Sequence, residues 1–334
     1  MPFQALELPR CSFKQQNENY IFCSVSEVSD QPIGDQFIIS NGVVFLNYER
    51  SLVPIACDCK RGEEYFCDEK SGIINQTKKA IKMKTYPRTA KYDPDWIAEN
   101  WMGPNPLWLL EELCEHLDLR PGMKVLDMGC GKGLTSVFLA KEYGVTVFAN
   151  DLWISATDNL RRFEKAGVAD RVFPIHAEAH TLPYAEEFFD VVLSIDSYHY
   201  YGTDESYLPG VFAKLVKPGG QLGIVVPGLT KEFEKGYPET MKALWVGEMF
   251  TFHSGTWWRH LWEKTGLVKI TACYDIDNPK AVWQSWADWS EVHFEKEFGE
   301  IGGDNVSDVQ FLNADTENDI ALIVMAATKN SANT

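Results

Sequence analysis

The stretch VLDMGCGKG, residues 125–133, decides how this chain folds. Its first half is apolar, as in a buried β-strand, and its second half carries three glycines at alternate positions before a helical pattern at residues 134–143. Glycine adopts backbone angles closed to other residues and lets a ligand approach the main chain. The strand, turn and helix therefore predict the opening of a nucleotide-binding α/β unit.

Two details of this stretch narrow the prediction. The spacing is G-x-G-x-G, whereas dinucleotide enzymes use G-x-G-x-x-G, which disfavours an NAD-dependent dehydrogenase. Asp127 lies inside the strand, two residues before the first glycine. A strand buried on both faces seldom carries an acid unless that acid has a partner at the strand end, so we expect Asp127 to belong to the binding site.

The composition is that of an ordinary globular protein. The 334 residues are 45% apolar and 24% charged, and no apolar run approaches the roughly 20 residues that cross a bilayer. We expect a cytoplasmic protein, because the first residues show no secretory pattern. The net charge of −17 argues against a nucleic-acid partner and against binding to acidic membranes, and the lack of a long apolar run argues against stable membrane insertion.

Residues 1–80 predict a small β-rich appendage. Two apolar runs, 38–39 and 43–46, flank Ser40-Asn41-Gly42, a hairpin signal. This segment holds five of the eight cysteines: Cys11, Cys23, Cys57, Cys59 and Cys67. Their spacing lacks the paired C-x2-C of zinc ribbons, so we predict reduced cysteines and no metal, with a thiolate zinc site as the alternative.

Residues 81–106 predict a connector, because prolines interrupt helix there and aromatic residues are interleaved. We expect this connector to be either a lid over a bound ligand or a segment whose aromatic residues pack on the next domain. The catalytic domain is expected at 107–334, with insertions at 228–255 and 278–319.

Strands and helices alternate after residue 107, which is typical of a parallel sheet covered on both faces. The predicted class is therefore α/β: a Rossmann-like, seven-stranded, mostly parallel sheet. Six strands follow the first one, at Val145–Asn150, Val172–His176, Phe189–Ile195, Gln221–Val226, Leu267–Tyr274 and Ile320–Ala327. A helix is expected at 155–166, with Ser155 as its N-cap and Gly167 as its stop, and another at 205–216.

The glycine stretch resembles motif I of the class I S-adenosylmethionine-dependent methyltransferases, and further similarity covers about residues 105–275 and the last strand. Residues 177–184 look like the family's Gly-Asp-Ala-x-x-Leu-Pro-Phe segment, and 215–220 match its turn before strand five. The small-molecule group is the best match, with some similarity to the cyclopropane fatty acid synthase-like group.

The resemblance implies S-adenosylmethionine as cofactor and assigns roles around it. Asp151 would accept the ribose hydroxyls, since one carboxylate offers acceptors to both. Glu178 would take the adenine amino group, and Ala179 would present its backbone amide to the ring. The full cofactor set is Asp127, Gly129, Cys130, Gly131, Gly133, Asp151, Leu152, Glu178, Ala179 and Asp196.

The acceptor side is expected at residues 196–201, which follow the fourth strand, because ligands bind at the carboxyl ends of parallel strands. His199 is the candidate base, since an imidazole titrates near neutral pH. Tyr198 and Tyr200 would hold the acceptor or the sulfonium, whose charge favours aromatic faces. In the alternative, transfer needs positioning alone and some of these tyrosines only pack.

The predicted function is methyl transfer from S-adenosylmethionine to an N, O, S or C atom of a small molecule. A lipid-modifying enzyme like the cyclopropane synthases and a non-catalytic cofactor-binding module remain the alternatives. Residues 278–319 contain ten Asp and Glu against two Lys, which suits a cationic or neutral acceptor better than an anionic one. The oligomeric state is left open.

Overall fold

The computed structural model describes residues 84–245, 247–298 and 307–331, together with three strands between residues 37 and 55. The chain divides into two compact units, 1–82 and 83–334, which are described separately below.

The first unit contains a three-stranded antiparallel sheet in the order β1 (Phe37–Ser40), β2 (Val43–Tyr48) and β3 (Ser51–Ile55). Ser40 pairs with Val43, so the predicted hairpin is confirmed. Its turn residues, Asn41 and Gly42, lie outside the described residues. The five cysteines of this unit lie outside them too, and with them the alternative of a zinc site.

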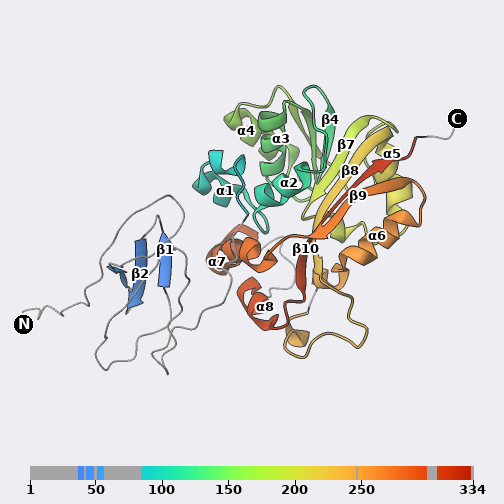
Figure 1. Ribbon diagram of the computed structural model, residues 1–334. Coiled ribbons are helices and arrows are strands. Elements are labelled where there is room, and N and C mark those ends of the chain that lie inside the picture. The colour runs from blue at the N-terminus through green and yellow to red at the C-terminus, as the bar shows by residue number, and fades with distance from the viewer. Residues whose placement is uncertain are drawn as a thin grey trace, which may run out of the picture. The chain divides into compact units, whose positions relative to one another are not determined.

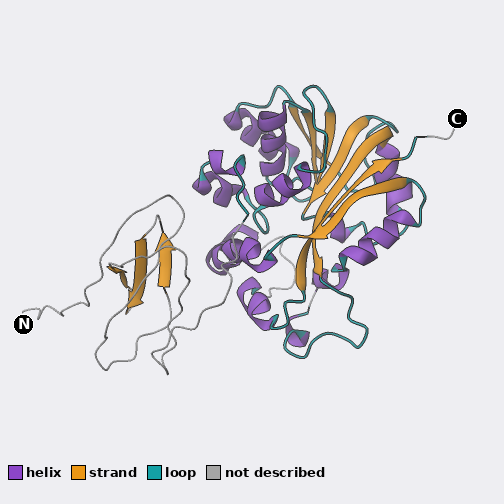
Figure 2. Ribbon diagram, viewed as in Figure 1, coloured by secondary structure: helices purple, strands orange, loops and turns teal. Residues whose placement is uncertain are grey.

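The second unit is built on a seven-stranded sheet in the order β6-β5-β4-β7-β8-β10-β9 (Figures 1 and 2). Five neighbouring strands, β6 to β8 in that order, run parallel, and β10 is antiparallel to both its neighbours. The Rossmann-like, mostly parallel sheet predicted from the sequence is confirmed. The strands are β4 (Lys124–Met128), β5 (Thr146–Asp151), β6 (Val172–His176), β7 (Phe189–Ile195), β8 (Val216–Leu229), β9 (Val268–Asp275) and β10 (Ile320–Lys329).

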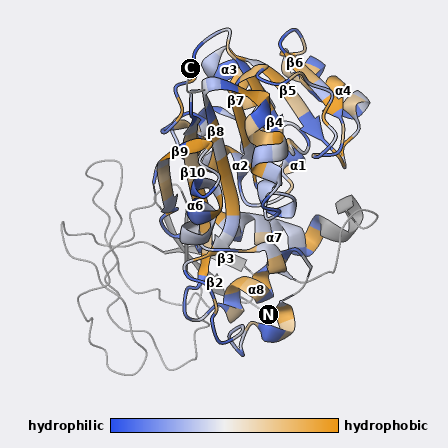
Figure 3. Ribbon diagram, turned by 90° about the vertical axis from the view of Figure 1, so that its right-hand side faces the viewer, coloured by the Kyte–Doolittle hydropathy of each residue, from blue (hydrophilic) through white to orange (hydrophobic). Residues whose placement is uncertain are grey.

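Helices cover both faces of the sheet (Figure 2). One face packs against α2 (Pro106–Cys114), α3 (Leu134–Tyr143) and α4 (Ala156–Ala166). The other packs against η3 (Leu208–Phe212), α5 (Ala213–Leu215) and α6 (Gly255–Glu263). In β10, Leu322 and Val324 enter the first core while Ile323 and Met325 enter the second, as the period of two in a strand requires. Both cores are apolar, and β7 in particular is coloured as hydrophobic in Figure 3.

Local signals set the helix bounds. The Ser155 hydroxyl accepts the amide of Asp158 at the start of α4, and Gly167 ends that helix with a left-handed φ of 71°. Asn105 caps α2 in the same way, and Pro106 occupies its first position, where no amide donor is needed.

The region before strand five differs from the prediction. A long helix is expected at 205–216, but Pro209 lies in a short π-helical turn, η3, and α5 has only three residues. Strand β8 begins at Val216, which pairs with Phe189, and the register shifts before Gln221 pairs with Val191. The predicted turn at 217–220 is therefore a bulge within the strand, because Pro218 and Gly219 interrupt the ladder without ending it.

The connector and the two insertions carry their own helices. The connector holds η1 (Thr89–Lys91) and α1 (Pro94–Asn100). Short 3-10 turns follow β7 and lie in the first insertion: η2 (Tyr198–Tyr200), η4 (Lys242–Leu244) and η5 (Gly247–Thr251). The second insertion forms α7 (Pro279–Phe298) and α8 (Asp308–Ala314). Among the described residues, no helix has the length and apolar character needed to cross a bilayer.

Candidate active site

The glycine turn joins β4 to α3 at the carboxyl edge of the sheet. Gly129, Gly131 and Gly133 all have left-handed backbone angles, with φ of 71°, 54° and 82°. A Cβ on Gly129 would overlap the side chain of Ser197, and one on Gly133 would overlap the ring of Phe163. Both the conformation and the close approach of neighbours therefore require glycine here.

Asp127 lies beneath this turn and is fully buried. Its Oδ2 accepts hydrogen bonds from Thr135 Oγ1 and Ser136 Oγ, each at 2.6 Å, while its Oδ1 has no partner among the described residues. Burial raises the pKa of this carboxyl to about 6, against the two hydroxyl donors, which lower it. A buried acceptor without a donor is rare and marks a place where a ligand donor fits.

Asp151 ends β5 and holds the glycine turn in place. Its Oδ2 accepts the amide of Gly131 at 2.7 Å, and its Oδ1 accepts the amides of Trp153 and Ile154 at 2.8 Å each. A carboxylate offers about four acceptor positions, so one is left for a ligand hydroxyl. Sequence reasoning placed Asp151 at the site but missed its hydrogen bond to the glycine turn, because Gly131 lies twenty residues away in the sequence.

The remaining residues predicted to hold the cofactor lie around the same edge. Glu178 accepts the amide and the Nδ1–H of its neighbour His180, both at 2.7 Å, so its carboxylate is turned toward that ring. The carbonyl of Ala179 accepts the hydroxyl of Tyr207. Leu152 is 52% exposed beside Asp151, an apolar surface on which a planar ring can pack. The roles assigned to these three residues stay predictions.

Cys130, the remaining member of the glycine stretch, is buried, and its Sγ accepts a long hydrogen bond from Asn159 Nδ2 at 3.7 Å. Burial raises the pKa of its thiol well above the usual value, so the sulfur is protonated and unreactive at neutral pH. We infer that its contribution is packing within the turn.

The connector lies directly over the turn. Met102 Sδ is 3.0 Å from the position that a Cβ on Gly131 would take, and a Cβ on Gly103 would overlap the carboxylate of Asp196. We call residues 101–103 the strap. The strap touches both the cofactor turn and the loop after β7, which is the placement expected of a lid.

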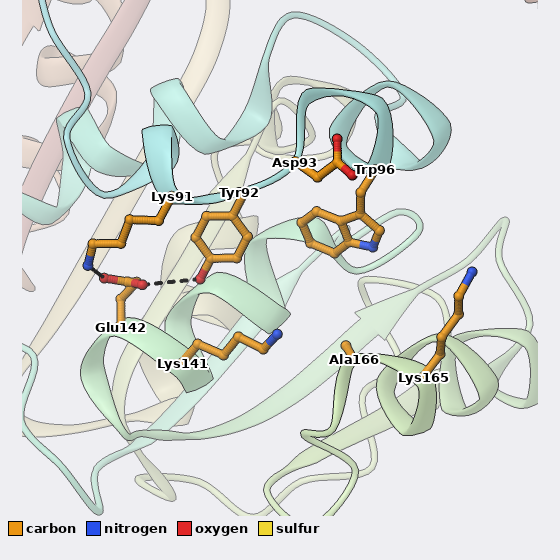
Figure 4. Close-up of a pocket in the computed structure, with 8 residues that line it drawn as sticks. All are labelled: Lys91, Tyr92, Asp93, Trp96, Lys141, Glu142, Lys165 and Ala166. Carbon is orange, nitrogen blue, oxygen red and sulfur yellow. Dashed lines mark hydrogen bonds and ion pairs between the residues drawn. The ribbon is translucent and has the colours of Figure 1, made fainter.

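The rest of the connector is fixed to α3 by charged contacts. Glu142 accepts from Lys91 Nζ at 2.5 Å and from the hydroxyl of Tyr92 at 3.4 Å, at the edge of a cavity of about 450 Å³ (Figure 4). Figure 4 shows that Tyr92 and Trp96 form its connector side, opposite Lys141 and Lys165 from α3 and α4. This cavity lies at the carboxyl ends of those helices, so it is separate from the glycine turn at the start of α3.

On the acceptor side, Tyr198 is not where a substrate contact would need it. Its side chain is fully buried among Tyr207, Phe212, Trp258 and Trp262, in the core beneath the sheet. Its hydroxyl has no hydrogen-bond partner among the described residues. We therefore infer a packing role for Tyr198.

His199 is 1% exposed, and its Nδ1 has no partner among the described residues. Its ring lies 4.1 Å from that of Tyr200 and 5.8 Å from that of Phe252, centroid to centroid. Burial lowers the pKa of the imidazole to about 3. The ring is therefore neutral at pH 7 and a weak base, so its proposed role as general base stays a prediction that its environment disfavours.

Three carboxylates lie near Tyr200. The Tyr200 hydroxyl donates to Glu248 of η5. Asp196 follows β7 with a left-handed φ of 53°, and both Glu248 and Asp308 of α8 raise the pKa of its carboxyl, after burial, which is the largest cause. Sequence reasoning found Asp196 and Tyr200 and missed Glu248 and Asp308. The acidity of the second insertion was a signal for Asp308, whereas nothing in the first insertion pointed to Glu248.

The comparisons with known proteins agree with this geometry. A family model described as a methyltransferase domain matches residues 125–220. Methyltransferase GfsG from Streptomyces halstedii is 36% identical over 117 residues, 35% of this chain and 42% of that protein. The chain therefore spans less than half the length of this relative.

Solved structures share the fold at low sequence identity. Phosphoethanolamine N-methyltransferase 2 from Haemonchus contortus, in complex with S-adenosyl-L-methionine, has a TM-score of 0.55 and 20% identity, covering 71% of this chain and 56% of that one. The [4+2]-cyclase SpnF has a TM-score of 0.53 and 17% identity, covering 67% and 81%. The domain at residues 125–220 therefore belongs to the class I S-adenosylmethionine-dependent methyltransferases, as the glycine stretch predicted.

Proposed function

We propose that this chain transfers the methyl group of S-adenosylmethionine to a small-molecule nucleophile. The observation that carries the proposal is the glycine turn within the matched methyltransferase domain, with its three left-handed glycines and the buried acid below it. In this proposal residues 107–334 form the catalytic domain, 81–106 the lid and 1–80 an appendage. The cytoplasmic location and the lack of a nucleic-acid partner stay predictions.

The residues of the turn fit the proposed cofactor. Asp127 Oδ1 is a buried acceptor without a partner among the described residues, which suits a charged amino group. Asp151 retains one acceptor position for a ribose hydroxyl, and the exposed Leu152 offers an apolar face to a base. When bound, S-adenosylmethionine supplies a methyl carbon on a positively charged sulfur.

The chain's own residues then position and enclose the reacting atoms. Asp196 and Tyr200 follow β7, beside the glycine turn, where an acceptor would approach the methyl carbon in line with the sulfur. The strap covers this point from above through Met102 and Gly103 and limits the access of water. Positioning and enclosure are the main contributions of the chain to the transfer, and the neutral His199 is not needed as a general base.

Two other functions remain as competitors. A lipid-modifying enzyme like the cyclopropane synthases would act on an apolar acceptor, and a non-catalytic module would bind the cofactor only. The cyclase SpnF has a similar fold, so the fold alone does not determine the reaction. The matched domain and the enclosed site favour methyl transfer to a small molecule.

The test combines binding and transfer with the full chain. Thermal shift should show stabilisation by S-adenosylmethionine and S-adenosylhomocysteine and none by NAD. With S-adenosylmethionine labelled in its methyl group and a metabolite extract, label should enter small molecules, and a Gly129→Val variant should transfer none. Binding without any transfer would favour the non-catalytic module, and transfer into extracted lipid alone would favour the cyclopropane synthase-like enzyme.

A further inference from the structure

The proposed acceptor side carries three carboxylates from three separate elements: Asp196 after β7, Glu248 in η5 and Asp308 at the start of α8. Contacts tie all three to one region. The Tyr200 hydroxyl donates to Glu248, the carboxylate of Asp196 lies against Gly103 of the strap, and Trp286, which donates to Asp308, lies edge-on to Trp101 of the same strap. In agreement, Glu248 and Asp308 raise the pKa of Asp196, and Glu248 helps to raise that of Asp308 to about 6. In each case burial is the larger cause. The loop after β7 and the two insertions therefore converge on one acidic site.

The described residues supply no cation to this site. Among the residues that the structure describes, none of the three carboxylates forms an ion pair with lysine, arginine or histidine. Their neighbours are neutral donors: the Tyr200 hydroxyl on Glu248, and the indole N–H groups of Trp283 and Trp286 on Asp308 at 3.1 and 2.9 Å. Like charges held together without a counter-ion are costly, and a ligand cation would relieve this cost.

The described part of the chain contains no cluster of acids, histidines or cysteines placed to hold a metal ion. The surroundings are aromatic instead: Trp101 of the strap lies edge-on to Trp286 at 6.1 Å, and Tyr200 is 42% exposed. Aromatic faces attract organic cations, for which they replace part of the solvent shell. The site thus suits an organic cation better than a metal.

A second observation points to the same ligand. His199 packs against Tyr200, whose hydroxyl is bound to Glu248, and against Phe252, which directly follows η5. It is 1% exposed, yet its Nδ1 lacks a partner. Because the imidazole is neutral, it needs a neighbour to complete its hydrogen bonds, and the N–H of an ammonium group can donate to a ring nitrogen that carries no proton.

We propose that the acceptor is a small amine, cationic in its resting form, held by Asp196, Glu248 and Asp308 against an aromatic wall. This inference rests on the proposed methyl transfer and specifies its acceptor atom as nitrogen. The two insertions, in this view, are the specificity elements of the enzyme, because each contributes one of the three carboxylates.

The chemistry of the step balances. The acceptor nitrogen first gives one proton to the carboxylate of Asp196, whose pKa is raised by burial and by the charges of Glu248 and Asp308, which makes it a stronger base than an ordinary carboxylate. Its lone pair then forms a bond to the methyl carbon while the carbon–sulfur bond breaks, and the bonding electrons pass to sulfur. The product nitrogen is again positively charged and remains in the field of the carboxylates of Glu248 and Asp308, while Asp196 holds the proton until it passes to solvent.

The first test measures binding to the full chain saturated with S-adenosylhomocysteine. Calorimetry would compare 2-(dimethylamino)ethanol with 3-methylbutan-1-ol, which has the same skeleton with carbon in place of nitrogen. The amine should bind at least about tenfold more tightly, the lower end of the effect of a hydrogen bond to a charged group. If the alcohol binds equally well, or neither binds, the inference is wrong.

The second test removes one charge at a time. Glu248→Gln should reduce the preference for the amine by about tenfold and leave affinity for S-adenosylhomocysteine unchanged. Asp308→Asn should act in the same direction if it folds. The matched control is Glu239→Gln, in the same insertion, whose side chain is 87% exposed and pairs only with Lys242; it should retain the preference.

The third test separates this inference from the proposed function. Methyl-labelled S-adenosylmethionine would be supplied with matched panels of amines, alcohols, thiols and carboxylates. Label confined to the amine panel supports the inference. Label confined to the other panels overturns it and leaves methyl transfer standing, whereas failure to bind S-adenosylhomocysteine overturns both.

Discussion

The proposed cofactor and acceptor sides satisfy their polar groups in opposite ways. On the cofactor side, the carboxylate of Asp151 accepts three backbone amides, and Thr135 and Ser136 donate to Asp127, so most groups are completed by the local chain. On the proposed acceptor side, burial and the charges of Glu248 and Asp308 raise the pKa of Asp196, and none of these three carboxylates pairs with a cation among the described residues. The first side is preorganised, and the second stores unfavourable charge that a ligand can relieve.

The largest effect should come from the preorganised side. Gly129→Ala should lower the affinity for S-adenosylhomocysteine by about a hundredfold, roughly 3 kcal/mol, because the new methyl group would overlap Ser197 and distort the turn. Gly167→Ala is the matched control, since Gly167 has the same φ of 71° and nothing within 4 Å of the added carbon. Calorimetry should show normal affinity for the control, with a stability loss of about 1–2 kcal/mol. If both variants lost the same affinity, the loss would come from backbone strain at a left-handed φ and not from the overlap of the new methyl group with Ser197.

Asp151→Ala should have the next largest effect. We expect the affinity for S-adenosylhomocysteine to fall by roughly 10- to 150-fold, the equivalent of 1.5–3 kcal/mol for hydrogen bonds to a charged group. The amides of Gly131, Trp153 and Ile154 lose their acceptor in the same variant, so the turn should also exchange its amide hydrogens faster. Asp170→Ala, an exposed acid paired with Arg171, serves as control. Unchanged affinity in a folded Asp151 variant would show that Asp151 neither holds the glycine turn in its binding conformation nor accepts the ribose hydroxyls.

Asp127→Asn should separate stability from binding. The pKa of Asp127 is raised from 3.8 to about 6, so the folded state holds its proton more tightly than the unfolded state. The resulting stability is fully present below pH 3.8 and is lost as the pH rises through 6, roughly 3 kcal/mol in all. The variant should lack this loss, so the difference in unfolding free energy between the two proteins should change over that window.

In the same variant, affinity for S-adenosylmethionine should fall by about tenfold, because the unpartnered Oδ1 no longer offers a charge to the amino group. Denaturant titrations at several pH values would measure the first effect and calorimetry the second. A pH-independent difference in stability would mean that Asp127 titrates normally in the fold.

His199→Phe should have the smallest effect, on the acceptor side. The variant keeps the contacts with the rings of Tyr200 and Phe252 and removes the unpartnered nitrogen. Because the pKa of His199 is about 3, we expect less than a tenfold change in kcat and no inflection near pH 6.5 in the wild-type rate. An inflection between pH 6 and 7 that disappears in the variant would restore His199 as the base.

The difference between local and long-range interactions on the two sides also explains which features could be predicted from the sequence. Strands β6 and β7 have the predicted bounds, and the caps of α4 are the predicted Ser155 and Gly167, because local apolar runs and capping residues determine them. The acceptor side depends on long-range contacts. Trp283 and Trp286 have the spacing of a packing face, and nothing local indicates that their indole groups donate to Asp308.

Tyr198 shows that the sequence does not predict side-chain directions even within a single loop. Its neighbour in sequence, Tyr200, is 42% exposed, whereas Tyr198 is fully buried in the core on the other face of the sheet. A tight 3-10 turn directs neighbouring side chains to different sides, and the sequence does not specify the rotation of such a turn. The position of this loop was predictable, while the direction of each ring was not.

The left-handed backbone of Asp196 has a consequence for engineering. A non-glycine residue at a φ of 53° costs roughly 1 kcal/mol, and its carboxylate adds repulsion from Glu248 and Asp308. Glycine at this position would remove both penalties, so a selection for heat resistance alone would favour Asp196→Gly. The same change would delete the carboxylate that is proposed to take the acceptor's proton. Thermostable descendants of this protein therefore have to be screened for turnover at each round, because this gain in stability lies at the proposed acceptor site.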